Sequence, residues 1–336
     1  MLLNFNSFKK KKKKIGVIGL NHGINIGNSL LKYAMFIQLT NLGFIPYLIG
    51  TNYRHRDISF LKKYTNCIII KKNFTEIKRK EYDYLMVNSD QTWRRFDRHF
   101  YNIGFLKFAE KWNIPKFIYG ASLGYSEWKL TKVDENIAKN LLKNFTGISV
   151  REKGSVNLVN IHFGVKPLFV LDPTLLINKK YYLNIIKNYK PNKSIKGKYI
   201  FTYIIKKENN IKTFIKYASK KLGYKVYNVR LGEPNSIEKF LYGIVNSKAV
   251  ITNSFHGTIF SIIFKKPFVT FIFKDSPKER LLSLKNSLEI KERIIEYNEF
   301  PNITLLTSPI NLNYTLLKLL RIRSINYIKK NLGIIK

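Results

Sequence analysis

One histidine lies between two apolar segments of the sequence. In "VITNSFHGTIFSIIF" (250–264), His256 and Gly257 separate a strand-like segment from a helix-like one. A histidine titrates near neutral pH and can act as a general acid. The first N–H groups of a helix, together with the hydroxyls of Ser254 and Thr258, favour an anion. The pattern therefore predicts an anion site beside a proton donor. A turn in which His256 only packs and hydrogen-bonds is the alternative interpretation.

Three further polar turns follow strand-like segments. "NHGINIGN" (21–28) supplies glycines and a capping asparagine, and "VNSDQTW" (87–93) supplies Ser, Asp and Gln beside a tryptophan. "SVREKG" (149–154) places Arg151 where its planar fork can hold a carboxylate or phosphate. Turn formation explains the serine and aspartate nearly as well, and a salt bridge with a neighbouring acid is the structural alternative for Arg151. The first turn lacks G-x-G-x-x-G spacing, so a dinucleotide site is not indicated.

The sequence offers little to hold a metal. Cys67 is the one cysteine, and the other four histidines lie in glycine-rich, basic or loop contexts without metal-ligand spacing. Neither H-E-x-x-H nor a G-x-S-x-G elbow occurs. We therefore predict a site without a metal or a bound cofactor.

The elements that must position these turns alternate along the chain. Short β-branched segments alternate with segments of helical spacing, which predicts an α/β protein with parallel sheets. The expected strands are residues 14–20, 45–50, 67–72, 84–90, 116–122, 148–154, 198–205, 224–230, 249–254 and 267–273. The expected helices include 29–43, 209–222, 236–246, 257–264 and 313–333. Ligands of such sheets bind beyond the carboxyl ends of the strands.

The alternation breaks over residues 170–198, which contain two prolines and a basic, polar segment. We place the domain boundary there. The expected organisation is a basic disordered tail (1–14), an N-terminal α/β domain (15–177), a linker (178–197) and a C-terminal α/β domain ending in a helix (198–336). The cleft between two such domains is the natural active site.

The chain is strongly basic, with 60 Lys and Arg against 21 Asp and Glu and a formal net charge of +39. Such charge favours nucleic acid or anionic membranes. Lys9–Lys14 supplies only six of these charges, and the rest are scattered through a chain also rich in Ile and Asn. We interpret the charge as compositional bias and expect no specific nucleic-acid partner. Peripheral contact of Lys9–Lys14 with an anionic membrane is the alternative to a disordered tail.

No run of about 18 apolar residues predicts a membrane-spanning helix. The first lysines follow a short apolar stretch instead of preceding a long one, which does not fit a secretory signal. The expected location is cytoplasmic, with peripheral association at the inner membrane face as an option.

Taken in order, these turns resemble the motifs of the polysaccharide pyruvyl transferase family. "NIGNSLLKYA" (25–34) resembles N-x-G-N-x-L-x-x-Y-A, "NSDQTW" (88–93) resembles G-S-D-Q-x-W, "ASLG" (121–124) resembles A-S-[FL]-G and "SVREKG" resembles S-x-R-E. "VLDPTLLI" (170–177) is similar to V-x-D-P-T-L, and the turn at His256 is similar to S-F-H-G. Asn88 departs from the family's usual glycine before Ser-Asp-Gln. Each motif is short, but six in one order are specific.

The resemblance implies two Rossmann-like domains, similar to GT-B glycosyltransferases, with the active site in the interdomain cleft. It implies transfer of the pyruvyl group of phosphoenolpyruvate to sugar hydroxyls of a polysaccharide or its precursor. The product is a cyclic ketal, and phosphate is released. The expected partners are phosphoenolpyruvate and a sugar or glycan acceptor, free or linked to a nucleotide or a lipid.

The same resemblance implies roles for individual residues. His256, Arg151 and Arg280 are the expected catalytic residues, with Lys274 or Lys278 as alternatives to Arg280. The expected substrate-binding residues are Asn25, Gly27, Asn28, Ser89, Asp90, Gln91, Ser122, Ser254, Gly257 and Thr258. Phosphoenolpyruvate carries a carboxylate and a phosphate, which suits cations, and ketal formation begins with protonation of its methylene carbon, which suits a histidine.

Two rival functions remain open at this level. A GT-B-type glycosyltransferase using a nucleotide-sugar would share the architecture, but it needs a base- and ribose-binding pocket for which no motif is found. A basic nucleic-acid-binding protein needs a basic stripe on one face, whereas the lysines are dispersed in the sequence.

Overall fold

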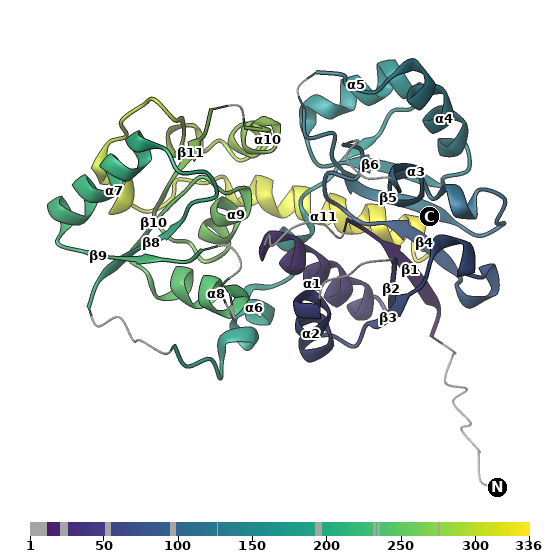
Figure 1. Ribbon diagram of the computed structural model, residues 1–336, viewed down its shortest axis with the longest axis horizontal. Coiled ribbons are helices and arrows are strands. Elements are labelled where there is room, and N and C mark those ends of the chain that lie inside the picture. The colour runs from purple at the N-terminus through teal and green to yellow at the C-terminus, as the bar shows by residue number, and fades with distance from the viewer. Residues whose placement is uncertain are drawn as a thin grey trace, which may run out of the picture.

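Two parallel β-sheets form the scaffold, one in each half of the molecule, and helices pack against them (Figure 1). The computed structural model describes residues 12–20, 26–50, 55–94, 99–125, 127–191, 197–230, 233, 236–274 and 276–336. Asn25, an expected substrate-binding residue, and Lys9–Lys11, part of the predicted basic tail, lie outside these described residues.

The first sheet has seven strands in the order β3-β2-β1-β4-β5-β6-β7. They are β1 (Lys14–Ile18), β2 (Ile45–Gly50), β3 (Ile68–Lys71), β4 (Tyr84–Val87), β5 (Lys116–Ala121), β6 (Gly147–Val150) and β7 (Leu168–Phe169). The second sheet has five strands in the order β12-β11-β10-β8-β9. They are β8 (Tyr199–Tyr203), β9 (Lys225–Asn228), β10 (Ala249–Thr252), β11 (Phe268–Ile272) and β12 (Ile294–Glu296). The central strands β4 and β10 are buried throughout, as expected for parallel strands covered on both faces.

The helices connect successive strands. They are α1 (Ile26–Asn41), α2 (His55–Tyr64), α3 (Phe100–Phe105), α4 (Lys132–Leu142), α5 (Lys153–Phe163), α6 (Lys179–Ile186), α7 (Asn209–Leu222), α8 (Ser236–Asn246), α9 (Phe255–Ile263), α10 (Glu279–Ser287) and α11 (Tyr314–Asn331). Short 3-10 helices occupy Phe74–Glu76, Arg79–Glu81, Lys107–Ala109, Pro173–Leu175, Lys291–Arg293 and Ile303–Leu306. Helix α7 shows why such segments are helical. Its buried Ile211, Phe214 and Ala218 recur every three to four residues, and Gly223 ends it in a left-handed conformation.

The strand order reverses at one point in each sheet. The reversal falls between β1 and β4 in the first sheet and between β8 and β10 in the second. Crevices for ligands open beyond the carboxyl ends of the strands at such points. The turn after β4 begins at Asn88, and α9 begins directly after β10. Both segments were singled out from the sequence, so the topology explains why polar residues gather there.

Helix α11 joins the two halves. It follows the second sheet in the chain yet packs on the first (Figure 1), where the Tyr327 hydroxyl donates to the Ile118 carbonyl at 2.7 Å. Ser324 Oγ accepts from the Leu171 N–H at 2.9 Å, and the Tyr84 hydroxyl donates to the Leu332 carbonyl at 3.1 Å. One apolar core also runs through both sheets and includes residues from Ile15 to Leu332. The halves are therefore held together by packing and by a shared helix.

The predicted α/β class is confirmed, and each expected strand and helix coincides with an observed element to within a few residues. The short strands β7 and β12 were not expected. Helix α6 lies inside the stretch expected to be a linker, and its buried Tyr182 and Ile185, three residues apart, pack it toward α8. The sequence did not reveal this helix because it is only eight residues long and lies in a stretch with two prolines and many lysines.

Candidate active site

Arg151 is buried at the carboxyl end of β6 and is surrounded by acids. Its Nη1 lies 2.8 Å from Asp172 Oδ2, its Nη2 lies 3.0 Å from Asp90 Oδ1, and its Nε lies 3.6 Å from Glu152 Oε1. Burial by itself would lower the pKa of Arg151, but the three carboxylates outweigh it and raise the pKa. The arginine therefore stays charged and ties the turns after β4, β6 and β7 together.

Asp90 reaches Arg151 from an unusual backbone conformation. Its φ is 140°, a region that favours glycine, and its carbonyl accepts from the N–H groups of Thr92 (2.7 Å) and Ser122 (2.9 Å). The Ser89 hydroxyl fixes the same turn by donating to the Gly120 carbonyl at 2.8 Å. Strained backbone of this kind persists where the surroundings enforce it and is common at functional sites. Here it aims the Asp90 carboxylate at the arginine.

Asp172 links Arg151 to His256. Its Oδ1 accepts from the Thr174 N–H and hydroxyl, and its Oδ2 contacts Arg151 on one side and lies 3.8 Å from His256 Nε2 on the other. Burial would raise the pKa of Asp172, but His256, Arg151 and Thr174 more than offset this and lower the pKa. The carboxylate is therefore ionised at neutral pH.

His256 lies in the first turn of α9 and is 2% exposed. Burial is the main cause that lowers its pKa to about 4, and Arg151 and Arg280 add to this while Asp172 opposes it. The imidazole is therefore neutral at pH 7. Its Nε2 is buried and has no hydrogen-bond partner among the described residues. A Cβ added to Gly27 would lie 1.9 Å from Nδ1, so the start of α1 presses directly against the ring.

The neighbouring polar residues hold the turn before α9. Ser254 Oγ accepts from the Gly257 N–H at 3.3 Å, which caps the helix. The Thr258 hydroxyl donates to the Ser254 carbonyl at 3.0 Å and lies 2.8 Å from Thr270 Oγ1. A Cβ on Gly257 would meet Thr252 Oγ1 at 2.4 Å. The capping interpretation accounts for Ser254, Gly257 and Thr258, whose contact with a substrate stays a prediction.

Arg280, in the first turn of α10, shares the ring of Phe255 with Arg151. The guanidinium carbons of Arg280 and Arg151 lie 5.3 Å and 5.5 Å from the ring centroid. Burial, with Arg151 in second place, lowers the pKa of Arg280 to about 10. Within the described part of the chain, Arg280 forms no ion pair and its buried Nε has no partner. Arg280 therefore keeps a positive charge that pairs directly with no described acid, although Asp90, Glu152 and Asp172 act on it from farther away.

The comparisons with known proteins agree with this geometry. The sequence model of the family described as polysaccharide pyruvyl transferase matches residues 25–274, which is most of the chain. This chain belongs to the polysaccharide pyruvyl transferase family. Among curated proteins, none matches the sequence.

Solved structures resemble the pyruvyl transferase chain in fold. A UDP-GlcNAc 2-epimerase from Neisseria meningitidis bound to UDP-GlcNAc is 11% identical, with 96% of this chain and 100% of that one covered and a TM-score of 0.61. The S. aureus MnaA–UDP co-structure is 14% identical, with 96% and 98% covered and a TM-score of 0.57. The epimerase from Methanocaldococcus jannaschii is 14% identical, with 93% and 99% covered and a TM-score of 0.53. The predicted GT-B-like fold is confirmed.

The two lysines considered in place of Arg280 lie elsewhere. Lys274 is exposed, and its N–H donates to Glu208 at 3.0 Å beside a cavity formed with Lys206 and Tyr297. Lys278 is exposed and lines the space between the halves. Neither lysine forms a contact with Phe255 in the described part of the chain. Arg280 is thus the basic residue of this segment that joins Arg151 and His256.

Several members of the site were not singled out from the sequence. Asp172 and Glu152 stand inside quoted motifs, but acids beside proline or glycine are common in turns. Phe255 read as an apolar residue of the helix. Lys32, 3% exposed in α1, has its pKa lowered by burial, which Asp57 and Asp90 oppose. The signal that could have indicated a buried Lys32 is its place among apolar residues of a helix-like segment.

Three further expected substrate-binding residues, Gln91, Ser122 and Asn28, lie at the ends of strands or at the start of a helix. Gln91 follows Asp90, and its N–H donates to Asp90 Oδ1 at 2.8 Å. Ser122, fully buried, follows β5, and its hydroxyl has no hydrogen-bond partner among the described residues. Asn28 lies in the first turn of α1 beside Gly27. The structure thus brings nearly all described motif residues to one edge of the two sheets.

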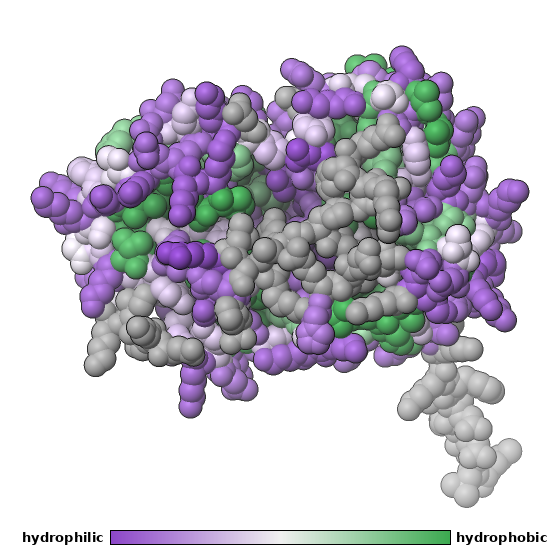
Figure 2. Space-filling model, in the orientation of Figure 1, coloured by the Kyte–Doolittle hydropathy of each residue, from purple (hydrophilic) through white to green (hydrophobic). Residues whose placement is uncertain are grey.

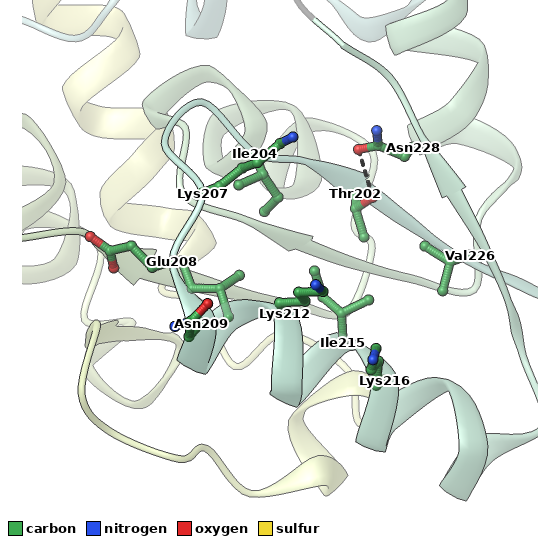
Figure 3. Close-up of a pocket in the computed structure, with 11 residues that line it drawn as sticks. Thr202, Ile204, Lys207, Glu208, Asn209, Lys212, Ile215, Lys216, Val226 and Asn228 are labelled. Carbon is green, nitrogen blue, oxygen red and sulfur yellow. Dashed lines mark hydrogen bonds between the residues drawn. The ribbon is translucent and has the colours of Figure 1, made fainter.

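The second half also contains a cavity of about 440 Å³ that is separate from this site (Figure 3). Its floor is apolar, formed by Ile204, Ile211, Ile215 and Val226, and Thr202 donates to Asn228 Oδ1 at 3.1 Å on its far side. Its lining contains none of Arg151, His256 and Arg280.

Hydrophilic side chains project from both halves on the face seen in Figure 2. Among the described residues, no group of three or more His, Cys, Asp or Glu is placed to hold a metal ion. The described helices also include none that is long and apolar enough to cross a membrane.

Proposed function

We propose that this protein transfers the pyruvyl group of phosphoenolpyruvate to two hydroxyls of a sugar in a polysaccharide or its precursor, forming a ketal and releasing phosphate. The observation that carries the proposal is that Arg280 Nε and His256 Nε2, both beside the Phe255 ring, are buried and have no hydrogen-bond partner among the described residues. Buried polar atoms of this kind are rare unless a ligand completes them.

Donor binding would rest on Arg280. A carboxylate or phosphate placed against its guanidinium restores the stabilisation that burial removed, and a charge-assisted hydrogen bond is strong in a buried site. Arg151 is already paired with three acids. Its role is to fix Asp172 and the turn of Asp90.

Proton transfer would rest on His256. The bound dianion raises the pKa of the imidazole, so donor binding draws a proton onto a ring that is neutral beforehand. The ring then donates that proton to the methylene carbon, which becomes a methyl group, and C2 gains oxocarbenium character. One sugar hydroxyl adds to C2 and gives its proton to the imidazole, which restores the acid. The second hydroxyl displaces phosphate and closes the ketal, and its proton leaves with the phosphate.

The cytoplasmic side of the membrane is the proposed location, because phosphoenolpyruvate is made there. Lys13 and Lys14, the last residues of the basic run, lie at the start of β1, where Lys13 Nζ donates to the Tyr84 hydroxyl at 3.2 Å. Peripheral contact with an anionic inner membrane face through Lys9–Lys14 stays part of the proposal.

The direct test is phosphate release from phosphoenolpyruvate across a panel of free, nucleotide-linked and lipid-linked sugars, with a chelator present. We expect release to depend on a sugar with two suitably placed hydroxyls and to disappear in His256→Gln. The same panel tests the glycosyltransferase alternative, since the similar structures include complexes with UDP and UDP-GlcNAc. Release of UDP without use of phosphoenolpyruvate would favour that alternative.

A further inference from the structure

A cavity of about 420 Å³ lies between the halves, directly beside Arg280. One wall comes from the first half, with Arg94, Gly124, Tyr125, Glu127 and Lys129, and the other comes from Ser276, Pro277, Lys278 and Glu279. The volume is in the range of small-molecule sites. Glu279 precedes Arg280 in the first turn of α10, so this helix turn contributes both to the second wall and to the donor site.

The first wall also connects to the donor site. Arg94 Nη1 lies 3.4 Å from Gln91 Oε1, and the Gln91 N–H donates to Asp90, the partner of Arg151. Gly124, with φ of 71°, makes this arrangement possible, because a Cβ there would lie 2.6 Å from Gln91 Nε2 and 3.4 Å from Arg94 Cδ. The wall is thus shaped around these two side chains.

Tyr125 holds two cations at this wall. Arg94 Nε donates to the Tyr125 hydroxyl at 2.7 Å, and the guanidinium carbon lies 4.8 Å from the ring centroid. Lys129 Nζ lies 4.4 Å from the same centroid. The two positive charges are therefore no farther apart than the sum of those distances. Two positive charges gathered in this way attract anions, and Glu127 supplies one carboxylate in the same wall.

The opposite wall adds the exposed cation of Lys278 together with the carboxylate of Glu279, and Glu127 adds a second carboxylate to the first wall. Carboxylates accept hydrogen bonds from sugar hydroxyls, whereas arginine and lysine bind phosphate oxygens. A ligand that satisfies both kinds of group carries hydroxyls and an anion. A free neutral sugar satisfies only the first kind.

We propose that this cavity binds the acceptor sugar through a phosphate or diphosphate attached to it, with Arg94, Lys129 and Lys278 contacting the phosphate. The inference rests on the proposed function, since it names the class of acceptor that the pyruvyl group reaches. A nucleoside diphosphate and a lipid diphosphate share this chemistry, and the test separates them.

The test measures equilibrium binding by titration calorimetry. The probes are glucose, galactose, mannose, N-acetylglucosamine and N-acetylmannosamine, each as the free sugar, the 1-phosphate, the UDP-sugar and the polyprenyl diphosphate in detergent. We expect the phosphorylated form of at least one sugar to bind about tenfold more tightly than the free sugar or better, as charge-assisted hydrogen bonds require. Preference for the UDP or the polyprenyl form identifies the source of the phosphate.

Variants of the cavity residues test which side chains cause the preference for phosphorylated sugars. Arg94→Ala combined with Lys129→Ala should abolish the preference for the phosphorylated sugar, and Lys278→Ala should reduce it. Lys143→Ala, an exposed lysine at the end of α4, is the matched control and should leave it unchanged. Lys278 is exposed, so its variant should fold even if the double variant does not, and Arg94→Lys provides a second conservative check. Phosphoenolpyruvate affinity should stay within about twofold in all of these variants.

Equal affinity for phosphorylated and free sugars across the panel overturns the proposal, and so does a preference that persists in both the double variant and Lys278→Ala. The result is separable from the proposed function. Phosphate-dependent sugar binding without any release of phosphate from phosphoenolpyruvate contradicts the function and supports the cavity. Ketal formation that uses free sugars as well as phosphorylated ones supports the function and contradicts the cavity assignment.

Discussion

The two halves of the molecule bring opposite kinds of charge chemistry to the same site. In the first half, Arg151 is matched by three carboxylates, each on its own turn. In the second half, Arg280 forms no ion pair with a described residue, and its Nε and His256 Nε2, like Arg151 Nε in the first half, have no hydrogen-bond partner among the described residues. One cation is neutralised by the fold, and the other is not.

This contrast distinguishes residues that stabilise the folded site from residues that contact the substrate. A buried cation with three partners contributes to the folded state, and removing it leaves buried charges unpaired. A buried polar group without partners costs stability until a ligand arrives, which is the arrangement expected of an active site. The first half therefore acts as the rigid frame, and the second half carries the groups that meet the donor.

The largest effect should come from breaking the frame. Arg151→Ala leaves Asp90, Asp172 and Glu152 as unpaired buried acids, and we expect a loss of about 3–5 kcal/mol in the free energy of unfolding. Chemical denaturation measures this loss. Arg280→Ala, measured in parallel, should lose less than about 1 kcal/mol because it removes no ion pair. Similar losses in the two variants would contradict the contrast between the halves.

Removing the proton donor should abolish most turnover without affecting the frame. His256→Gln keeps the size and a hydrogen-bonding group of the side chain but cannot donate a proton as an acid. We expect at least about 100-fold lower turnover in phosphate release with normal phosphoenolpyruvate binding. Near-normal turnover would make His256 a packing residue.

The contact between Gly27 of α1 and the His256 ring should affect turnover nearly as much as the acid itself does. Gly27→Ala places a Cβ 1.9 Å from His256 Nδ1, so the ring must move. Displacement of a catalytic group by about 1 Å can cost up to about 100-fold in rate. Gly19→Ala is the control, since its Cβ would meet Asn88 Cβ at an ordinary 3.6 Å. Full activity of Gly27→Ala would show that the ring position is not critical.

Arg280 should affect the donor more than the fold. Arg280→Ala removes the cation that no acid neutralises, and we expect the affinity for phosphoenolpyruvate to fall about tenfold or more. Arg280→Lys keeps the charge without the planar fork and should lose less. Calorimetric titration with phosphoenolpyruvate measures both variants. Unchanged affinity in Arg280→Ala would assign donor binding to another residue.

The smallest expected effect is on the pH dependence of the free energy of unfolding. Because the folded pKa of His256 is about 4 against 6.5 as a free group, the unfolded chain binds a proton that the folded one does not between those values. Stability should therefore fall as the pH drops from about 6.5 to 4, by a few kcal/mol at most. His256→Gln should lack this component. The depressed pKa of Asp172 adds a further loss only below 3.8.

Donor binding should reverse that shift. The bound dianion raises the pKa of His256, so binding near pH 7 should take up as much as one proton. Titrations in buffers of different ionisation enthalpy measure the uptake. His256→Gln, which should bind the donor without taking up a proton, is the control. Equal uptake in both proteins would place the titrating group elsewhere.

The repeated strand and helix pattern was predictable because it is local. Periods of two and 3.6 residues, with glycine and proline at the turns, predicted both sheets and the turn at His256. Short elements such as α6, β7 and β12 were not predicted, since few apolar positions mark them. The six family motifs were likewise readable in order, and the family match supports them.

The sequence by itself determined which residues have suitable chemistry: a histidine and two arginines at or near the carboxyl ends of strands. Only the tertiary structure decided which arginine is neutralised and which is not, because Asp90 and Asp172 reach Arg151 from 61 and 21 residues away. It also placed Gly27 against His256, and both arginines against Phe255. Such contacts depend on how two sheets close on one another, and side-chain type and spacing along the chain do not encode that distance.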